Sequence, residues 1–275
     1  MSQERESYEP LDNAGSREWL EKPPQKEVLS EAQRLVYFSK KKGITLRLLG
    51  GAGIFFASPS ASKETYARKY NDLDFIGKKR EGPKISKFFL EMGYHPRELF
   101  NKLQGDSRLI FLDKENDRRV DIFLDGFVMC HKFDFKDLLD KEGPSLAPAD
   151  LLLTKLQIVE INKKDIMDIA VLVLDNPPLF SKEKHTGSNH IEVGRLVEEC
   201  SEDWGVYKTI TLNIDKITGM LHELGIPSED AYRIAENLNK IRSAIEEAPK
   251  SLRWKMRARV GEKVRWYELP ESANA

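Results

Sequence analysis

Apolar residues recur with two different periods in the first half of the chain, and each period predicts one kind of element. From Ser30 to Gly43 they recur every three or four residues, which predicts a helix opened by a capping box of Ser30 and Gln33. Shorter apolar runs bounded by glycine and polar clusters are typical of strands. Strands are predicted over residues 44–49, 72–76, 108–112 and 118–124, and helices over 52–57 and 83–92.

The order of these elements predicts the fold class. Residues 113–117 join two strand-like runs through a polar turn, which indicates a hairpin. The serine- and lysine-containing stretch 58–70 is predicted to be a loop. Strand, helix, strand, helix and hairpin together predict an α/β fold with a small mixed sheet.

The pattern becomes helical after Gly126. Pro148 begins one helix, a second covers 163–174, and Pro177-Pro178 ends it. Further helices are predicted over 191–201, 206–224, 229–247 and 250–259. We therefore predict a tail without an ordered core (1–28), an α/β domain (29–178), a linker (179–190) and an all-helical domain (191–275).

Composition narrows the class of protein. The 275 residues are 40% hydrophobic and 32% charged with a formal net charge of −1, so nucleic acid or an anionic membrane would have to be met by a local patch. Cys130 and Cys200 lie far apart, which argues against a disulfide scaffold or a structural zinc site. Because no segment reaches the roughly 20 apolar residues of a membrane helix and no apolar leader opens the chain, we expect a cytoplasmic protein without a membrane partner.

Three carboxylates on two strand-like segments are the main chemical signal. Asp72 and Asp74 project from one side of a strand, since side chains alternate along it, and Asp121 lies in a second run of the same character. If the two strands are neighbours the carboxylates converge, and they repel one another unless a cation lies between them. Mg²⁺ is the hard cation expected beside the Gly50-Gly51 turn, which is suited to phosphate.

Each of these features also has an ordinary structural interpretation. Asp72 and Asp74 could be solvated acids on an exposed strand, and Gly50-Gly51 a plain turn that ends a strand. Lys164, Asp165 and Asp168 could be a charge ladder on a helix face, and Lys155 could extend along a helix to solvent.

The order of these motifs is similar to the minimal nucleotidyltransferase fold of the DNA polymerase β superfamily. Within it, Lys155 in the segment 148–156, followed by the segment 164–169, resembles the AbiEii-type branch of toxin-like nucleotidyltransferases. The resemblance covers roughly residues 30–176. The interval from Gly51 to Asp72 is longer than usual, so residues 58–70 are an insertion, and Ala52-Gly53 stands where a serine-type continuation is commoner.

The resemblance implies a nucleotidyltransferase core that moves a nucleoside monophosphate from a nucleoside triphosphate (NTP) to an acceptor and releases pyrophosphate. Asp72, Asp74 and Asp121 would hold Mg²⁺ or Mn²⁺, and Asp121 would also activate the acceptor hydroxyl. Either Arg68 or Lys69 would supply a cation to the triphosphate. The residues assigned to nucleotide binding are Gly50, Gly51, Arg68, Lys69, Lys155, Asp165 and Asp168.

A basic and aromatic segment near the end of the chain is a second signal. Cations beside flat rings suit single-stranded RNA or the end of a tRNA. The candidate RNA-binding residues are Arg253, Trp254, Lys255, Arg257 and Arg259. The alternative is a basic amphipathic helix whose tryptophans pack in the core.

Three functions remain open at this stage. The first is an active enzyme whose acceptor is RNA, tRNA or a protein, with an antitoxin protein as a candidate partner. The second is a small-molecule nucleotidyltransferase whose acceptor is an aminoglycoside-like compound. The third is a non-catalytic nucleotide-binding protein, against which the intact set of Asp72, Asp74 and Asp121 argues.

Overall fold

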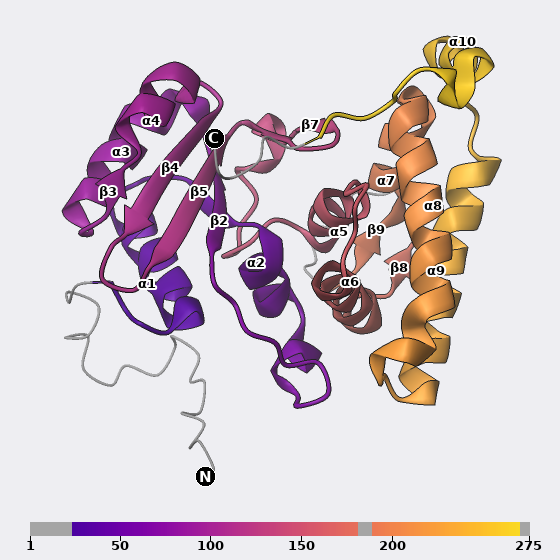
Figure 1. Ribbon diagram of the computed structural model, residues 1–275, viewed down its shortest axis with the longest axis horizontal. Coiled ribbons are helices and arrows are strands. Elements are labelled where there is room, and N and C mark those ends of the chain that lie inside the picture. Colours follow the sequence, from indigo (N-terminus) through magenta and orange to yellow (C-terminus); the bar gives the residue numbers. More distant parts are fainter. Residues whose placement is uncertain (1–23, 181–188, 270–275) are drawn as a thin grey trace.

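The structure, a computed structural model, describes residues 24–180 and 189–269 (Figure 1). Within them a five-stranded sheet has the order β1-β2-β5-β4-β3, and only the β2–β5 pair is parallel. Its strands are β1 (Leu46–Leu48), β2 (Leu73–Gly77), β3 (His95–Pro96), β4 (Arg108–Asp113) and β5 (Arg118–Leu124). The mixed sheet and the β4–β5 hairpin confirm the predicted fold class.

Ten α-helices lie within the described residues, and most of them fall where the apolar period predicts them. They are α1 (Val28–Lys41), α2 (Gly50–Ala57), α3 (Gly82–Glu91), α4 (Glu98–Gln104), α5 (Pro148–Leu156), α6 (Lys163–Asp175), α7 (Val193–Glu202), α8 (Trp204–Met220), α9 (Ser228–Glu247) and α10 (Leu252–Val260). Two short strand pairs complete the fold: β6 (Gly126–Val128) with β7 (Lys132–Asp134), and β8 (Pro178–Leu179) with β9 (Ile191–Glu192). No helix in the described part of the chain combines the length and apolar character needed to cross a bilayer.

Several local predictions are corrected. The first helix begins at Val28, and its N-cap is Glu27, whose carboxylate accepts from the backbone N–H of Ser30 at 2.6 Å; the predicted capping box at Ser30 is wrong. Helix α4 and the β6–β7 hairpin were not predicted, because both are short and α4 buries no residue. The predicted tail and linker lie largely outside the described residues.

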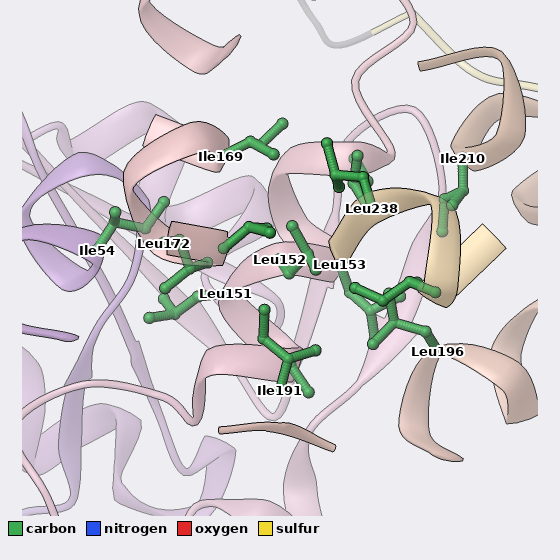
Figure 2. Close-up of a cluster of buried hydrophobic side chains, with 14 of the residues drawn as sticks. Ile54, Leu151, Leu152, Leu153, Ile169, Leu172, Ile191, Leu196, Ile210 and Leu238 are labelled. Atoms are coloured by element: carbon green, nitrogen blue, oxygen red, sulfur yellow. The ribbon is translucent and has the colours of Figure 1, made fainter. Parts of the chain in front are cut away.

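The sheet has two differently covered faces. One face contributes apolar residues of β2 and β5, such as Phe75 and Ile122, to a core beneath α1 and α3. The second core surrounds α5 and α6 and extends to α2 on one side and to α7, α8 and α9 on the other, as Figure 2 shows around Leu152. Helices α5 and α6 together pack against α2 on one side and against α7, α8 and α9 on the other. The division of the chain into two domains at residues 179–190 therefore stays a prediction.

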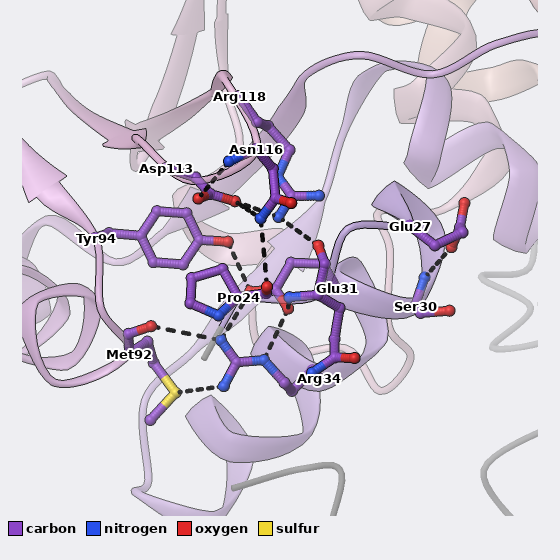
Figure 3. A network of polar contacts seen from close by, with 11 residues as sticks. Pro24, Glu27, Ser30, Glu31, Arg34, Met92, Tyr94, Asp113, Asn116 and Arg118 are labelled. Carbon is purple, nitrogen blue, oxygen red and sulfur yellow. Dashed lines mark hydrogen bonds and ion pairs between the residues drawn. The ribbon is translucent and has the colours of Figure 1, made fainter. Parts of the chain in front are cut away.

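A buried polar network ties α1 to the sheet (Figure 3). The Glu31 carboxylate accepts from Arg34 at 2.7 and 2.8 Å and from the Tyr94 hydroxyl at 2.6 Å. Nearby, Asp113 accepts from Arg118 at 2.6 Å and from Asn116 at 2.8 Å. Residues 24 and 25 join the two groups, because Asn116 and Arg118 donate to the carbonyls of Pro24 and Gln25, and the Gln25 N–H donates to Glu31. Since buried charges are tolerated only when paired and hydrogen-bonded, this network holds the start of α1 against the β4–β5 turn.

We expect Leu152→Ala to lower the free energy of unfolding by about 2–5 kcal/mol, because Leu152 is fully buried and its truncation leaves a cavity. Leu212→Ala is the control: this leucine of α8 is 46% exposed, and its loss should change stability by less than about 0.5 kcal/mol. Urea unfolding followed by circular dichroism measures both. Equal losses in the two variants would contradict the assignment of the core.

Candidate functional site

The structure brings the three predicted carboxylates to one end of the sheet. Asp74 on β2 is the direct register partner of Asp121 on the parallel strand β5, so both side chains lie on the same face. Asp72 lies one residue before β2 and on the same side of the chain. The negative charge of Asp121 contributes to the raised pKa of both Asp72 and Asp74, as expected for carboxylates at one end of the sheet.

Asp74 lies in an environment that disfavours the charged form of its carboxyl group. Burial raises the pKa of its carboxyl to about 6, with further contributions from Asp121 and Asp72. Burial and Asp121 likewise raise the pKa of Asp72. Among the described residues, no side chain forms a hydrogen bond or ion pair with the Asp74 carboxylate. An unpaired, partly buried carboxylate beside two others fits a divalent cation.

Asp121 pairs with two arginines that the sequence patterns did not predict. Arg108 on β4 reaches its Oδ1 at 2.6 Å, and Arg119 on β5 reaches its Oδ2 at 2.7 Å. Arg119 could have been found, because it stands two residues before Asp121 on the same strand face; Arg108 depends on the register of the hairpin. Within residues 24–180 and 189–269 no three histidine, cysteine or acidic side chains are arranged to hold a metal ion. Asp121 is engaged by Arg108 and Arg119, so a metal held with Asp72 and Asp74 would have to displace these arginines from its carboxylate.

The glycine turn touches this site directly. Helix α2 begins at Gly50, whose φ of +57° favours glycine, and no described side chain caps its first turn. A Cβ on Gly50 would lie 2.3 Å from Oδ2 of Asp74, and one on Gly51 would lie 1.8 Å from Nη2 of Arg68. Gly50 is favoured by its positive φ, whereas a side chain at Gly51 would displace the Arg68 guanidinium. The N–H groups that begin α2 lie beside Asp74 and this guanidinium.

Four predicted residues form a buried ionic network next to the turn. Asp168 accepts from Arg68 at 2.7 and 2.8 Å and pairs with Lys155 at 2.9 Å, while Lys155 donates to Asp165 at 2.7 Å. Burial lowers the pKa of Lys155, but Asp168 and Asp165 raise it above its ordinary value, so the ammonium stays charged. Lys155 also lowers the pKa of Asp74, which places its charge within reach of the carboxylates. Neither a solvated charge ladder nor a lysine extended to solvent describes these contacts.

The choice between Arg68 and Lys69 is decided by position. Arg68 lies against Gly51 and also stacks over the Tyr70 ring, with its guanidinium carbon 4.2 Å from the ring centroid. Lys69 is exposed. The geometry thus favours Arg68 as the cation that faces a phosphate at the turn.

The candidate RNA-binding residues are divided. The Trp254 ring makes an edge contact with Tyr207 at 5.2 Å, and the Arg257 guanidinium lies 4.9 Å from the centre of the Trp204 ring. Arg257 also donates to backbone carbonyls of the segment that follows α10. The exposed members of the set are Arg253, Lys255 and Arg259. Trp254 and Arg257 are therefore engaged in packing within the chain.

Comparison with known proteins gives few similarities. No protein-family profile matches the chain, and no curated protein matches it. Among solved structures, the lincosamide antibiotic adenylyltransferase LnuA with lincomycin bound is similar over 54% of this chain and 98% of its own, at 16% identity and a TM-score of 0.40. The antibiotic-resistance factor ANT(2'')-Ia is similar over 79% of this chain and 94% of its own, at 9% identity and a TM-score of 0.34. Similarities of this size do not assign an activity to this chain.

For an NTP bound at the turn, we expect Arg68→Gln to raise the KM by about 10- to 150-fold, because the change removes a charge-assisted phosphate contact worth roughly 1.5–3 kcal/mol. Lys69→Gln is the matched control: it removes the same charge from the adjacent exposed position and should leave KM within about twofold. Steady-state kinetics with the labelled nucleotide measures both constants. A larger effect at Lys69 would overturn the assignment.

We also expect Asp74→Asn to stabilise the metal-free protein at neutral pH. The folded-state pKa of about 6 lies above the ordinary value of 3.8, so ionising Asp74 disfavours the folded state increasingly as the pH rises from 3.8 to about 6. The variant should gain about 1–3 kcal/mol at pH 7.5 and less at pH 4.5. Thermal and urea unfolding in EDTA test this sign, and a loss of stability at pH 7.5 would contradict it.

Proposed function

We propose that this chain is a nucleotidyltransferase that moves a nucleoside monophosphate from an NTP to an acceptor. The observation that supports it most directly is the contact between the glycine turn and the carboxylates, with Oδ2 of Asp74 seated against Gly50 and Arg68 against Gly51. In the transfer an acceptor oxygen bonds to the α-phosphorus while the bond to the bridging oxygen breaks, and pyrophosphate leaves. Positioning and charge neutralisation supply most of the rate enhancement of such reactions.

The residues of the site divide between metal and phosphate. Asp72, Asp74 and Asp121 would hold Mg²⁺ or Mn²⁺, which neutralises charge on the triphosphate and makes the acceptor hydroxyl more acidic. The N–H groups at Gly50 and Gly51, at the start of α2, would bind the β- and γ-phosphates, and Arg68 with Lys155 would offset their charge. Asp165 and Asp168 hold both cations in place.

The acceptor in this reaction is either a macromolecule or a small molecule. An RNA, tRNA or protein acceptor, with an antitoxin partner, follows the AbiEii-type resemblance. A small-molecule acceptor is favoured by the packing of Trp254 against Tyr207 and of Arg257 against Trp204, because these groups are then not free to stack on bases. We therefore place the small-molecule acceptor first.

Labelled transfer tests the proposal. The purified chain is incubated with Mg²⁺ and each α-labelled NTP, together with total tRNA or with amine-bearing sugar compounds, and the label is followed on tRNA, compound and protein. Transfer that requires metal and disappears in Asp74→Asn supports the enzyme, and the labelled species identifies the acceptor class. NTP binding without transfer to any of these acceptors would favour the non-catalytic alternative.

A further inference from the structure

A cavity of about 430 Å³ is lined in part by Arg108, the arginine that pairs with Asp121. Helix α4, strand β5, the β6–β7 hairpin and the segment that follows α10 enclose it. Figure 1 shows this last segment returning from α10 to the hairpin, where the N–H of Glu268 donates to the Cys130 carbonyl at 3.0 Å. The cavity lining includes Phe100, Arg108, Phe123, Met129, Phe133 and Glu268.

Arg108 connects the cavity to the carboxylates. Its guanidinium carbon lies 4.7 Å from the centre of the Phe123 ring in the cavity wall, and its Nη2 lies 2.6 Å from Oδ1 of Asp121. Strand β5 lies between β2 and β4 in the sheet. Arg108, which lines the cavity, reaches Asp121 from β4, whereas Gly50 at the start of α2 lies against Asp74 on β2. A molecule in the cavity would therefore approach the carboxylates at Asp121, and a triphosphate at the glycine turn would approach them at Asp74.

The cavity wall carries more unpaired negative charge than unpaired positive charge. Within the described residues, Asp125, Asp134 and Glu268 line the cavity and form no ion pair; Asp125 and Asp134 each accept only a backbone N–H at 2.9 Å. Of the lining cations, Arg108 is paired with Asp121 and Lys79 with Asp106 at 3.6 Å, which leaves Lys132. Three unpaired carboxylates against one unpaired ammonium repel a triphosphate or an RNA backbone and attract a cation.

The remaining wall is apolar and aromatic. Phe123 and Phe133 are almost completely buried, and Phe100 and Met129 are half-buried at the cavity. A concave surface of this volume that combines aromatic and apolar side chains with charged groups can hold a small molecule that has both an apolar and a charged part.

Building on the proposed function, we propose that this cavity is the acceptor site, and that the acceptor is a small molecule that carries a protonated amine beside an apolar or aromatic portion. The amine faces Glu268, Asp125 and Asp134, and the apolar portion packs on the phenylalanines. The reacting hydroxyl then lies toward Asp121 and Arg108.

Three probes that share one apolar group and differ in charge test the site in metal-free, nucleotide-free protein. They are 4-phenylbutylamine, 4-phenylbutanol and 4-phenylbutyrate, titrated by NMR. We expect the amine to bind about threefold or more tightly than the alcohol, and the acid to bind most weakly. Equal affinities, or a preference for the acid, would overturn the proposal.

Matched variants locate the binding. Glu268→Gln should reduce the preference for the amine over the alcohol, whereas Glu115→Gln, at an exposed position in the β4–β5 turn, should not. Phe100→Ala should weaken all three probes several-fold, whereas Leu99→Ala, at a 72% exposed position of the same helix, should not. Identical behaviour of each variant and its control would place the probes elsewhere.

The binding data and the transfer data separate the two proposals. Amine-selective binding that depends on Glu268 and Phe100, in a protein that transfers no label, would support the cavity and overturn the enzymatic function. Nucleotidyl transfer by a protein that binds the three probes equally would support the enzymatic function and overturn the cavity as the acceptor site. Competition of a single-stranded RNA oligonucleotide with 4-phenylbutylamine would overturn the small-molecule acceptor and favour a nucleic acid at this cavity.

Discussion

Asp74→Asn is expected to lower the rate of nucleotidyl transfer by at least about 100-fold, the size of loss found when one preorganised group that stabilises charge is removed from an active site. Asp74 touches Gly50 on one side, is the register partner of Asp121 on the other, and forms no ion pair among the described residues. An amide of the same shape keeps the packing and removes the charge that would bind the metal.

The change in rate is measured by labelled transfer at saturating Mg²⁺ and NTP. Asp137→Asn, at an exposed aspartate between β7 and α5, is the control and should retain full activity. Because Asp74→Asn is also expected to be the more stable protein at neutral pH, a lost activity cannot be attributed to unfolding. Activity within about threefold of the parent protein would exclude Asp74 from the catalytic set.

Gly50→Ala is expected to reduce transfer by at least about tenfold, because the new methyl group would lie 2.3 Å from Oδ2 of Asp74 and the carboxylate would have to move. A displacement of about 1 Å at a reacting group is enough to produce losses of this size. The left-handed backbone at Gly50 also becomes strained, by roughly 1–2 kcal/mol.

Gly43→Ala separates the two effects. Gly43 has a φ of +64°, similar to the +57° of Gly50, but no atom lies within 4 Å of the Cβ that alanine would add. Both variants should therefore lose similar stability in urea unfolding, and only Gly50→Ala should lose activity. A comparable loss of activity in Gly43→Ala would show that backbone strain, and not contact with Asp74, is responsible.

The boundaries of the elements show how far local patterns extend. The strands around Asp74 and Asp121 and the helices α5, α6 and α9 are long or strongly periodic, and they lie close to their predicted residues. The β6–β7 hairpin and α4 are too short for a period to be measured, so they appear only in the fold. Both of them border the proposed acceptor cavity.

The sequence by itself determined that the chain forms a mixed α/β fold and that Asp72 and Asp74 project to one side, since alternation along a strand and the conformation of a glycine turn are local properties. Only the tertiary structure decided that Asp121 pairs with Arg108 and Arg119, that Arg68 and not Lys69 meets the turn, and that Trp254 packs against Tyr207. These contacts depend on strand register and helix packing between residues far apart in the chain. No local periodicity encodes which distant side chain will neutralise a given charge.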